Sequence, residues 1–380
     1  MSNRIVETRT VRTFGAPRRD RGQLMNFVLL GVLLVAALTI PYLGVSGFFV
    51  SLTSTILIAA TLATSVNFLA GNGGMVSLGH AGIAAAAAYG AGWASKQGFD
   101  PGMQVVFALG LTLLASLVYG LLSMRTSGIY FLMVTLAVGM LIYGLAFRLS
   151  SVTGGENGIS GISRPDWMES YWVFYYVVLA AFVLATAALW VIGNSPFGAS
   201  LRGIRDSESR MRSLGYSVRS YKLGAFMMSG TVAGLAGLLS VWHTHFVSPS
   251  SAGVDRSVHL IVMVILGGVG TLLGPLIGAA IVVLVENVLS SHVDRWPTVL
   301  GLIFILVILF ARAGIAGSTR KLYRRIRSRS TSAPPPERGA PDGASAPDGT
   351  HPATRSSARR NSAHDTATHD TATHQGKDLQ

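Results

Sequence analysis

The sequence predicts an all-α polytopic membrane protein with about eight to ten transmembrane helices, some short or interrupted by glycine, and a cytoplasmic amphipathic helix. Three observations lead to this class. Half of the 380 residues are hydrophobic and only 12% are charged, whereas soluble proteins carry about 25% charged residues. The mean hydropathy is +0.49. Several apolar runs approach the ~20 residues that an α-helix needs to cross a bilayer.

The net charge of +13 comes mainly from the two ends of the chain and one internal loop, with few aromatic residues between the cations. Basic segments beside membrane spans set orientation and attract anionic lipid, so we expect membrane lipid, and no nucleic acid, as a partner. The chain has no cysteine, which excludes disulfides and thiolate metal sites.

A basic segment, 1–25, is predicted to be cytoplasmic and to precede a membrane domain that covers residues 26–315. The expected spans in chain order are 26–45, 48–70, an alanine-rich helix ending near Trp93, 102–122, 128–149, 171–193, 223–243, 258–290 and 298–315. The run 258–290 would be about 50 Å long as one helix and contains a glycine-rich break. We therefore count it as two helices, of which the first is a short span or a re-entrant loop.

The C-terminal residues 316–380 are predicted to form a cytoplasmic tail that is basic at first and then disordered. They are rich in Pro, Ala, Ser, Thr and Gly and show no apolar periodicity. Positive charge places both termini and the loop 195–222 on the cytoplasmic side, which requires an even number of crossings, about ten. The expected location is the bacterial inner (plasma) membrane.

The loop 195–222 is the longest charged interruption between apolar regions, and it has the pattern of an amphipathic helix. Ser195 is a good N-cap, Pro196 suits the first helical position, and Gly215 suits a stop. The apolar residues recur in steps of three, four and seven at Phe197, Leu201, Ile204, Met211 and Leu214. Two interpretations stay open: a basic loop that only sets topology, and a helix that docks a cytoplasmic partner.

Glycine-rich interruptions lie beside apolar spans at 71–82, 153–159 and 266–275. Non-helical backbone at membrane depth is tolerated only inside protein or along a watery cavity, and broken helices are one way to recognise a zwitterion. The alternative is close helix packing through small residues four positions apart. Such spacing occurs at Gly82, Ala86 and Gly90, and at Gly230 and Gly234.

The sequence contains no soluble catalytic domain and no Walker A motif, so we predict a translocation subunit and not an enzyme. The most polar candidates expected within the membrane are His80, Glu156, Asn157 and Glu286. They are few for an ion-driven carrier that works alone, which needs buried carboxylates, although such a carrier is the main rival. A membrane enzyme would need a second catalytic group near His80 or Glu286, and none lies at convincing spacing.

Five segments resemble, in the same order, the LivM-type permeases, which are membrane subunits of ATP-driven (ABC) branched-chain amino acid importers. The matching segments are 71–92, 127–140, 153–162, 195–239 and 263–279. The most specific matches are the charged loop and the sequence LGGVGTLLGP. The resemblance implies that no cofactor is bound by this chain. It also implies two cytoplasmic ATP-binding subunits that use ATP, a second related permease subunit and an extracytoplasmic substrate-binding protein.

The resemblance makes import of branched-chain or other hydrophobic amino acids the expected function, and a urea or short-chain amide importer of the same family the alternative. The charged loop would then couple this chain to the ATP-binding subunits. Its expected contact residues are Leu201, Arg202, Ile204, Arg205, Glu208 and Gly215. The expected substrate path includes Asn72, Ser77, His80, Tyr130, Thr135, Glu156 and Asn157.

Overall fold

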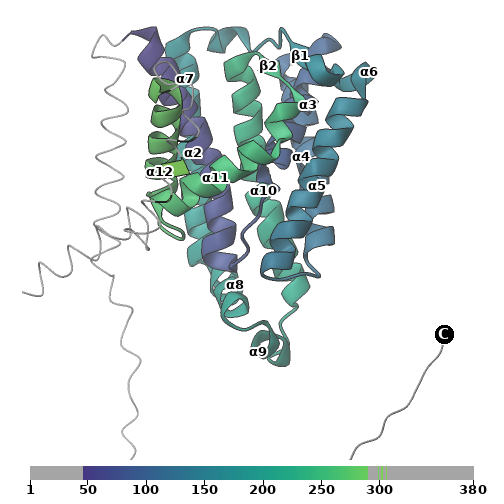
Figure 1. Cartoon of the computed structure of the whole chain (residues 1–380), viewed down its shortest axis with the longest axis vertical. Coiled ribbons are helices and arrows are strands. Elements are labelled where there is room, and N and C mark those ends of the chain that lie inside the picture. Colours follow the sequence, from purple (N-terminus) through teal and green to yellow (C-terminus); the bar gives the residue numbers. More distant parts are fainter. Residues whose placement is uncertain (1–45, 290–297, 299–300, 303–304, 306–380) are drawn as a thin grey trace, which may run out of the picture. The chain divides into compact units, whose positions relative to one another are not determined.

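A computed structural model describes residues 46–289, 298, 301–302 and 305, which are drawn in colour in Figure 1. The described part is built of helices with one two-stranded ribbon, which confirms the predicted all-α membrane fold. The predicted first span 26–45, most of the last span 298–315 and both terminal segments lie outside the described residues.

Five helices of the described part are long and apolar enough to cross a membrane. They are α2 (Gly47–Gly73), α4 (Pro101–Ser123), α5 (Ile129–Arg148), α7 (Tyr171–Asn194) and α10 (Val218–Thr244). Each matches a span predicted from the sequence, and the protein is therefore a multi-pass membrane protein. The start of α4 illustrates the local signals, because the Asp100 side chain accepts a hydrogen bond from the Gly102 N–H (3.2 Å) and Pro101 takes the first position.

The alanine-rich helix α3 (His80–Lys96) lies inside the bundle, against α4 and α10. It follows an irregular segment, 74–79, that begins where α2 ends at Gly74, whose φ of +66° suits glycine. The contacts of α3 are made by small residues, as expected in a membrane. A Cβ added at Gly90 would lie 2.8 Å from the Phe107 carbonyl oxygen of α4, and one at Gly237 of α10 would lie 2.0 Å from the Ala84 carbonyl oxygen of α3.

The run 258–290 is indeed two helices, as its length and glycines predicted. They are α11 (Val254–Gly267) and α12 (Gly274–Leu284), joined by the turn 268–273, and α12 continues into a π-helical turn, η5 (Val285–Leu289). The two helices approach backbone to backbone, since a Cβ added at Gly278 would lie 1.8 Å from the Met263 carbonyl oxygen.

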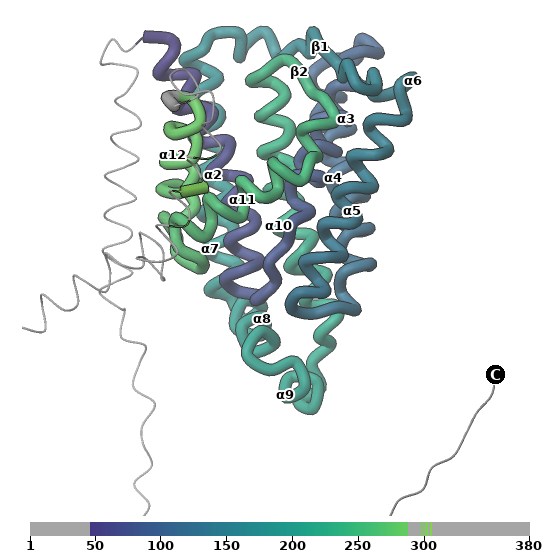
Figure 2. The backbone as a smooth tube through the Cα atoms, in the orientation of Figure 1, coloured from purple at the N-terminus to yellow at the C-terminus, as the bar shows by residue number. Residues whose placement is uncertain are grey.

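Short elements gather at one end of the bundle, around the antiparallel strands β1 (Ile159–Ser160) and β2 (Phe246–Val247), with Ile159 paired to Val247. The others are α6 (Ser150–Thr153), η2 (Gly155–Asn157), η3 (Asp166–Met168) and η4 (Pro249–Ala252). We call this end the strand end. Figure 2 shows α8 (Pro196–Asp206) and α9 (Glu208–Ser213) at the opposite end, which we call the α8 end.

The charged loop contains two helices, so the single amphipathic helix predicted from Ser195 to Gly215 is wrong in that respect. Extended backbone at Ser207 (φ −164°, ψ 104°) separates α8 from α9, and Ser207 Oγ accepts a hydrogen bond from the Arg210 N–H, which caps the second helix. The predicted N-cap at Ser195 is confirmed, because its side chain accepts from the Gly198 N–H. Gly215 ends α9 with φ +87°.

Candidate functional site

The first candidate site is the junction between α8 and the long helices. Leu201 and Ile204 are 0% and 1% exposed, and α8 packs against α2, α7 and α10. Leu201 belongs to a core cluster that includes Met75, Ala225 and Phe226. Because these two apolar side chains are turned into the bundle, they hold α8 in place, and a partner bound at the outer surface would not touch them in this conformation.

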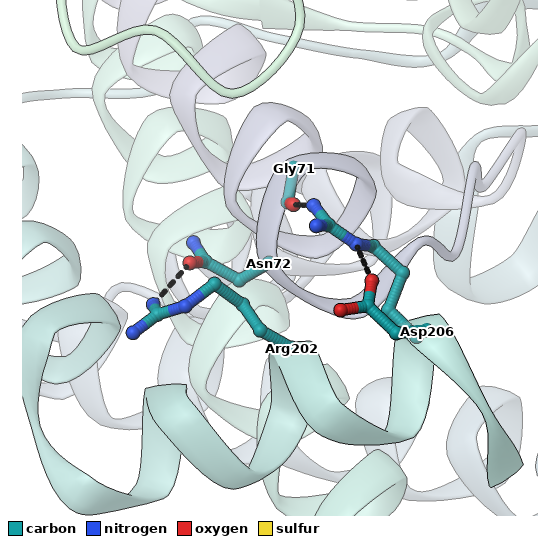
Figure 3. A network of polar contacts seen from close by, with 5 residues as sticks. Gly71, Asn72, Arg202 and Asp206 are labelled. Carbon is teal, nitrogen blue, oxygen red and sulfur yellow. Dashed lines mark hydrogen bonds and ion pairs between the residues drawn. The ribbon is translucent and has the colours of Figure 1, made fainter. Parts of the chain in front are cut away.

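The two arginines of α8 bind carbonyl groups left unpaired where neighbouring helices end. Figure 3 shows the bond to the Gly71 carbonyl oxygen and the bond from Arg202 to the Asn72 side chain. Arg202 donates from Nη1 to Asn72 Oδ1 (3.2 Å) and to the Gly193 carbonyl oxygen in the last turn of α7. Arg205 donates from Nη1 to the Gly71 carbonyl oxygen in the last turn of α2. A cation at a helix C-terminus also interacts favourably with the helix dipole, so both arginines tie α8 to membrane helices.

A third attachment joins α9 to the start of α10. Glu208 forms an ion pair with Lys222, whose side chain is only 5% exposed. Glu208 is 37% exposed, so the pair is only partly buried, but loss of Glu208 would leave the buried ammonium group of Lys222 without its counterion, and the contact therefore favours the observed position of α9.

The surface formed by α9, the following turn and the first turn of α10 carries cations and the exposed Leu214. Arg210, Arg212 and Arg219 are exposed, and Leu214 is 68% exposed. We call Arg210, Arg212, Leu214 and Arg219 the α9 face. Sequence reasoning missed this face because it placed Leu214 on the apolar side of one continuous helix. The N-cap signal of Ser207 followed by Glu208 could have indicated the break.

The second candidate site surrounds the irregular segment 74–79 and the start of α3. It brings together Ser77, His80 and Thr135, three of the residues expected along the substrate path. Thr135 Oγ1, from α5, accepts from the Leu78 N–H (3.1 Å), and Ser77 Oγ accepts from the Gly79 N–H (3.1 Å). Both backbone groups are thereby satisfied away from water.

His80 lies at the centre of this site and is 1% exposed. Its Nδ1 lies 3.0 Å from Ser77 Oγ and its Nε2 lies 2.8 Å from Ser229 Oγ of α10. Ser229 donates its own proton to the Ser65 carbonyl oxygen of α2 (2.7 Å), so its oxygen accepts from the His80 Nε2–H. His80 therefore joins α3 to α10 and, through Ser229, to α2.

The other expected path residues lie elsewhere. Asn72 binds Arg202 at the α8 junction, and Tyr130 is 69% exposed on α5. Glu156 and Asn157 are exposed in η2 at the strand end. The structure therefore brings three of the seven residues together and separates the remaining four from them.

The glycines around η2 fit their positions for conformational and steric reasons. Gly154 has φ +78° and Gly158 has φ +68°, and a Cβ added at Gly158 would lie 2.1 Å from the Val247 carbonyl oxygen of β2. Close packing therefore explains these glycines. Within the described residues, no group of three or more His, Cys, Asp or Glu could hold a metal ion.

Two further polar residues join helices in the bundle and were not predicted. Ser229 is the partner of His80, and Asn67 of α2 bonds to the turn 268–273. Polar side chains in apolar helices are a general signal of interhelical contacts, and Asn67 could have been noticed on that ground. Ser229 carries no comparable signal, because serine is common among small residues in membrane helices.

Comparisons with known proteins agree on one family. The model of the family described as "branched-chain amino acid transport system / permease component" matches residues 48–312. The chain is 27% identical over 339 residues to the high-affinity branched-chain amino acid transport system permease protein LivM of Escherichia coli (strain K12), covering 81% of this chain and 79% of that protein. The LivM protein of Salmonella typhimurium is also 27% identical, with the same coverage.

A second kind of relative also matches. The autoinducer 2 import system permease protein LsrC of Yersinia pseudotuberculosis serotype O:1b is 28% identical over 240 residues, which are 58% of this chain and 64% of that protein. No solved structure matches at a significant level.

Proposed function

Because this chain belongs to the family of permease components of branched-chain amino acid transport systems, we propose that it is a membrane subunit of an ATP-driven importer of branched-chain or other hydrophobic amino acids. In this proposal it forms part of the translocation path together with a second related permease. Two cytoplasmic subunits hydrolyse ATP, and an extracytoplasmic protein delivers the substrate. The chain itself performs no covalent chemistry.

The observation that carries the proposal is the attachment of α8 and α9. Arg202 binds the end of α7, Arg205 binds the end of α2, and Glu208 binds the start of α10 through Lys222. A displacement of this small unit would therefore act on three long helices together. Such an element suits a subunit that receives force from a partner, and a carrier driven by an ion gradient has no need of it.

The α8 end lies on the cytoplasmic side in this proposal, and the α9 face receives an ATP-binding subunit. The exposed Arg210, Arg212 and Arg219 would pair with acidic residues on the ATP-binding subunit. Leu214 would enter a small apolar pocket between those acidic residues. Four of the residues that the sequence analysis assigned to this contact have a structural role in the proposal instead. Leu201, Arg202, Ile204 and Arg205 fasten α8 to the bundle.

The segment 74–79 and the N-terminus of α3 are proposed to contribute to the substrate path. Tyr130, Glu156 and Asn157 would reach that path where the second permease covers their surfaces. If His80 senses the substrate, the His80→Leu variant transports a changed set of substrates. Unchanged transport in both His80→Leu and Asn157→Leu would show that these segments serve packing alone.

The relatives named for autoinducer 2 import support a second candidate, an importer of another small molecule. Urea and short-chain amides are further candidates. Uptake of radiolabelled leucine, isoleucine, valine, urea and autoinducer 2 by cells with and without the transporter would separate them. Saturable uptake of the three amino acids alone supports the leading proposal.

Purification from the native membrane in mild detergent tests the assembly. We expect two ATP-binding subunits and a second permease to co-purify with this chain and to hydrolyse ATP. In the same experiment, an Arg212→Glu, Leu214→Asp variant should lose the ATP-binding subunits, whereas a Ser200→Ala variant, altered on the exposed side of α8, should retain them. Recovery of the chain alone, repeated after cross-linking, would favour the ion-driven carrier instead.

A further inference from the structure

The turn 268–273 between α11 and α12 is held by one side chain of α2. Asn67 Oδ1 accepts from the Gly270 N–H (2.7 Å), and Asn67 Nδ2 donates to the Thr271 carbonyl oxygen (2.9 Å). One amide thus satisfies a donor and an acceptor of the turn. Gly268 and Gly270 have φ of +110° and +76°, which lets the backbone present both groups to the same side chain.

Gly71, one helical turn after Asn67, makes the second contact with this turn. A Cβ added at Gly71 would lie 2.6 Å from the Gly270 Cα and 3.1 Å from the Gly270 nitrogen, so the two backbones touch without a side chain between them. Any other residue at position 71 would push the turn away from α2.

The carbonyl oxygen of Gly71 is also the acceptor for Arg205 of α8, as Figure 3 shows. A single residue of α2 therefore contacts α8 through its oxygen and the turn through its Cα. Sliding the turn along α2 would break both hydrogen bonds of Asn67 and leave its buried amide without these two partners. The arrangement favours joint movement of α8, the end of α2 and the turn.

We propose that Asn67 is a positioning residue that makes the turn 268–273 follow α8, so that α11 and α12 are the part of the permease that the coupling movement displaces. This inference rests on the proposed function for the source of the force. The attachment itself can be tested on the chain alone.

The first test is amide hydrogen–deuterium exchange on the full chain in lipid nanodiscs. Arg205→Ala removes the bond from α8 to Gly71, and we expect exchange in the peptide covering 268–273 to become about threefold faster or more. Arg212→Ala, a change at an exposed arginine of α9, should leave that peptide unchanged. Faster exchange in α8 with an unaltered turn would overturn the inference, and this outcome does not depend on any partner.

The second test uses the absence of native cysteine. Single cysteines are placed at Val269, which is 47% exposed in the turn, and at Ser209, which is exposed on α9. Thiol labelling rates are compared between ATP-bound and nucleotide-free states of the co-purified complex. In the Asn67→Leu background, the Ser209 reporter should still respond to ATP, and the response at Val269 should be lost.

The same variant should lower uptake about tenfold while ATP hydrolysis continues, since the loss of both Asn67 hydrogen bonds releases the turn from α2. Thr61→Val is the matched control, because Thr61 is buried on the same helix and bonds only within it, to the Leu57 carbonyl oxygen (2.8 Å). A persistent ATP response at Val269 in Asn67→Leu would overturn the inference. If the labelling rate of the cysteine at position 209 does not respond to ATP when Asn67 is retained, that result would instead count against the proposed function.

Discussion

Two of the breaks between helices in the described part of the chain, 74–79 and 268–273, are stabilised in different ways. At 74–79 the backbone and its neighbours are satisfied by side chains from several helices, among them Thr135 of α5 and Ser229 of α10. At 268–273 one amide, Asn67, provides both bonds from α2, and glycine contacts supply the rest. The first break is stabilised by hydrogen bonds from side chains of several helices. The second is stabilised by one side chain and by backbone contacts so close that no Cβ fits between them.

The largest effect on stability is expected from the glycine contacts beside the second break. Gly278→Ala would place a Cβ 1.8 Å from the Met263 carbonyl oxygen, and we expect a loss of about 3 kcal/mol in the free energy of unfolding. Gly110→Ala is the control, because nothing lies within 4 Å of a Cβ at that helical glycine. Thermal unfolding in detergent measures both, and equal stability of the two variants would contradict the close-packed interpretation.

The network at the first break should show its strongest dependence on Ser229. Ser229→Ala deprives the buried His80 Nε2–H of its acceptor and removes the side-chain donor to the Ser65 carbonyl oxygen, so we expect a loss of about 2 kcal/mol in the free energy of unfolding. Thr231→Val, also on α10, removes only a bond within the helix, to Met227. If both variants unfold at the same temperature, the hydrogen bond between His80 and Ser229 does not contribute to stability.

A smaller effect is expected from Thr135→Val. The change keeps the shape of the side chain and leaves the Leu78 N–H without its acceptor, which should cost about 1 kcal/mol. Chemical denaturation of the purified protein, with Thr61→Val as reference, measures this difference. A loss as large as that from Gly278→Ala would mean that the first break is no more tolerant than the second.

The smallest effect on stability is expected for a substitution outside both breaks. Asn157→Leu alters an exposed side chain in η2, so the free energy of unfolding should change by less than about 0.5 kcal/mol. Any change in substrate selectivity measured for this variant would then be attributable to transport and not to folding. A large loss of stability would show that η2 has contacts beyond those described.

The long helices could be predicted because length and hydropathy alone determine them, and the break at 268–273 could be predicted from its glycines. The division of α8 from α9 was missed because helical periodicity continues from Ile204 to Met211 across the capping residue Ser207. The partners of Arg202 and Arg205 could not be predicted, since both bind backbone carbonyls of distant helix ends. Asn67 and Gly270 are 203 positions apart, and nothing local to either residue identifies the other.

The burial of α3 has a consequence for biogenesis. Its 17 residues would span about 25 Å, less than the hydrocarbon core, and they are mostly alanine and glycine, which gain little by entering lipid. The helix is buried by α4 on one side and by α10 on another, and α10 is synthesised more than a hundred residues later. Stable insertion of α3 therefore waits for α10, and a nascent chain that ends before Val218 would hold α3 at the bilayer without its final cover.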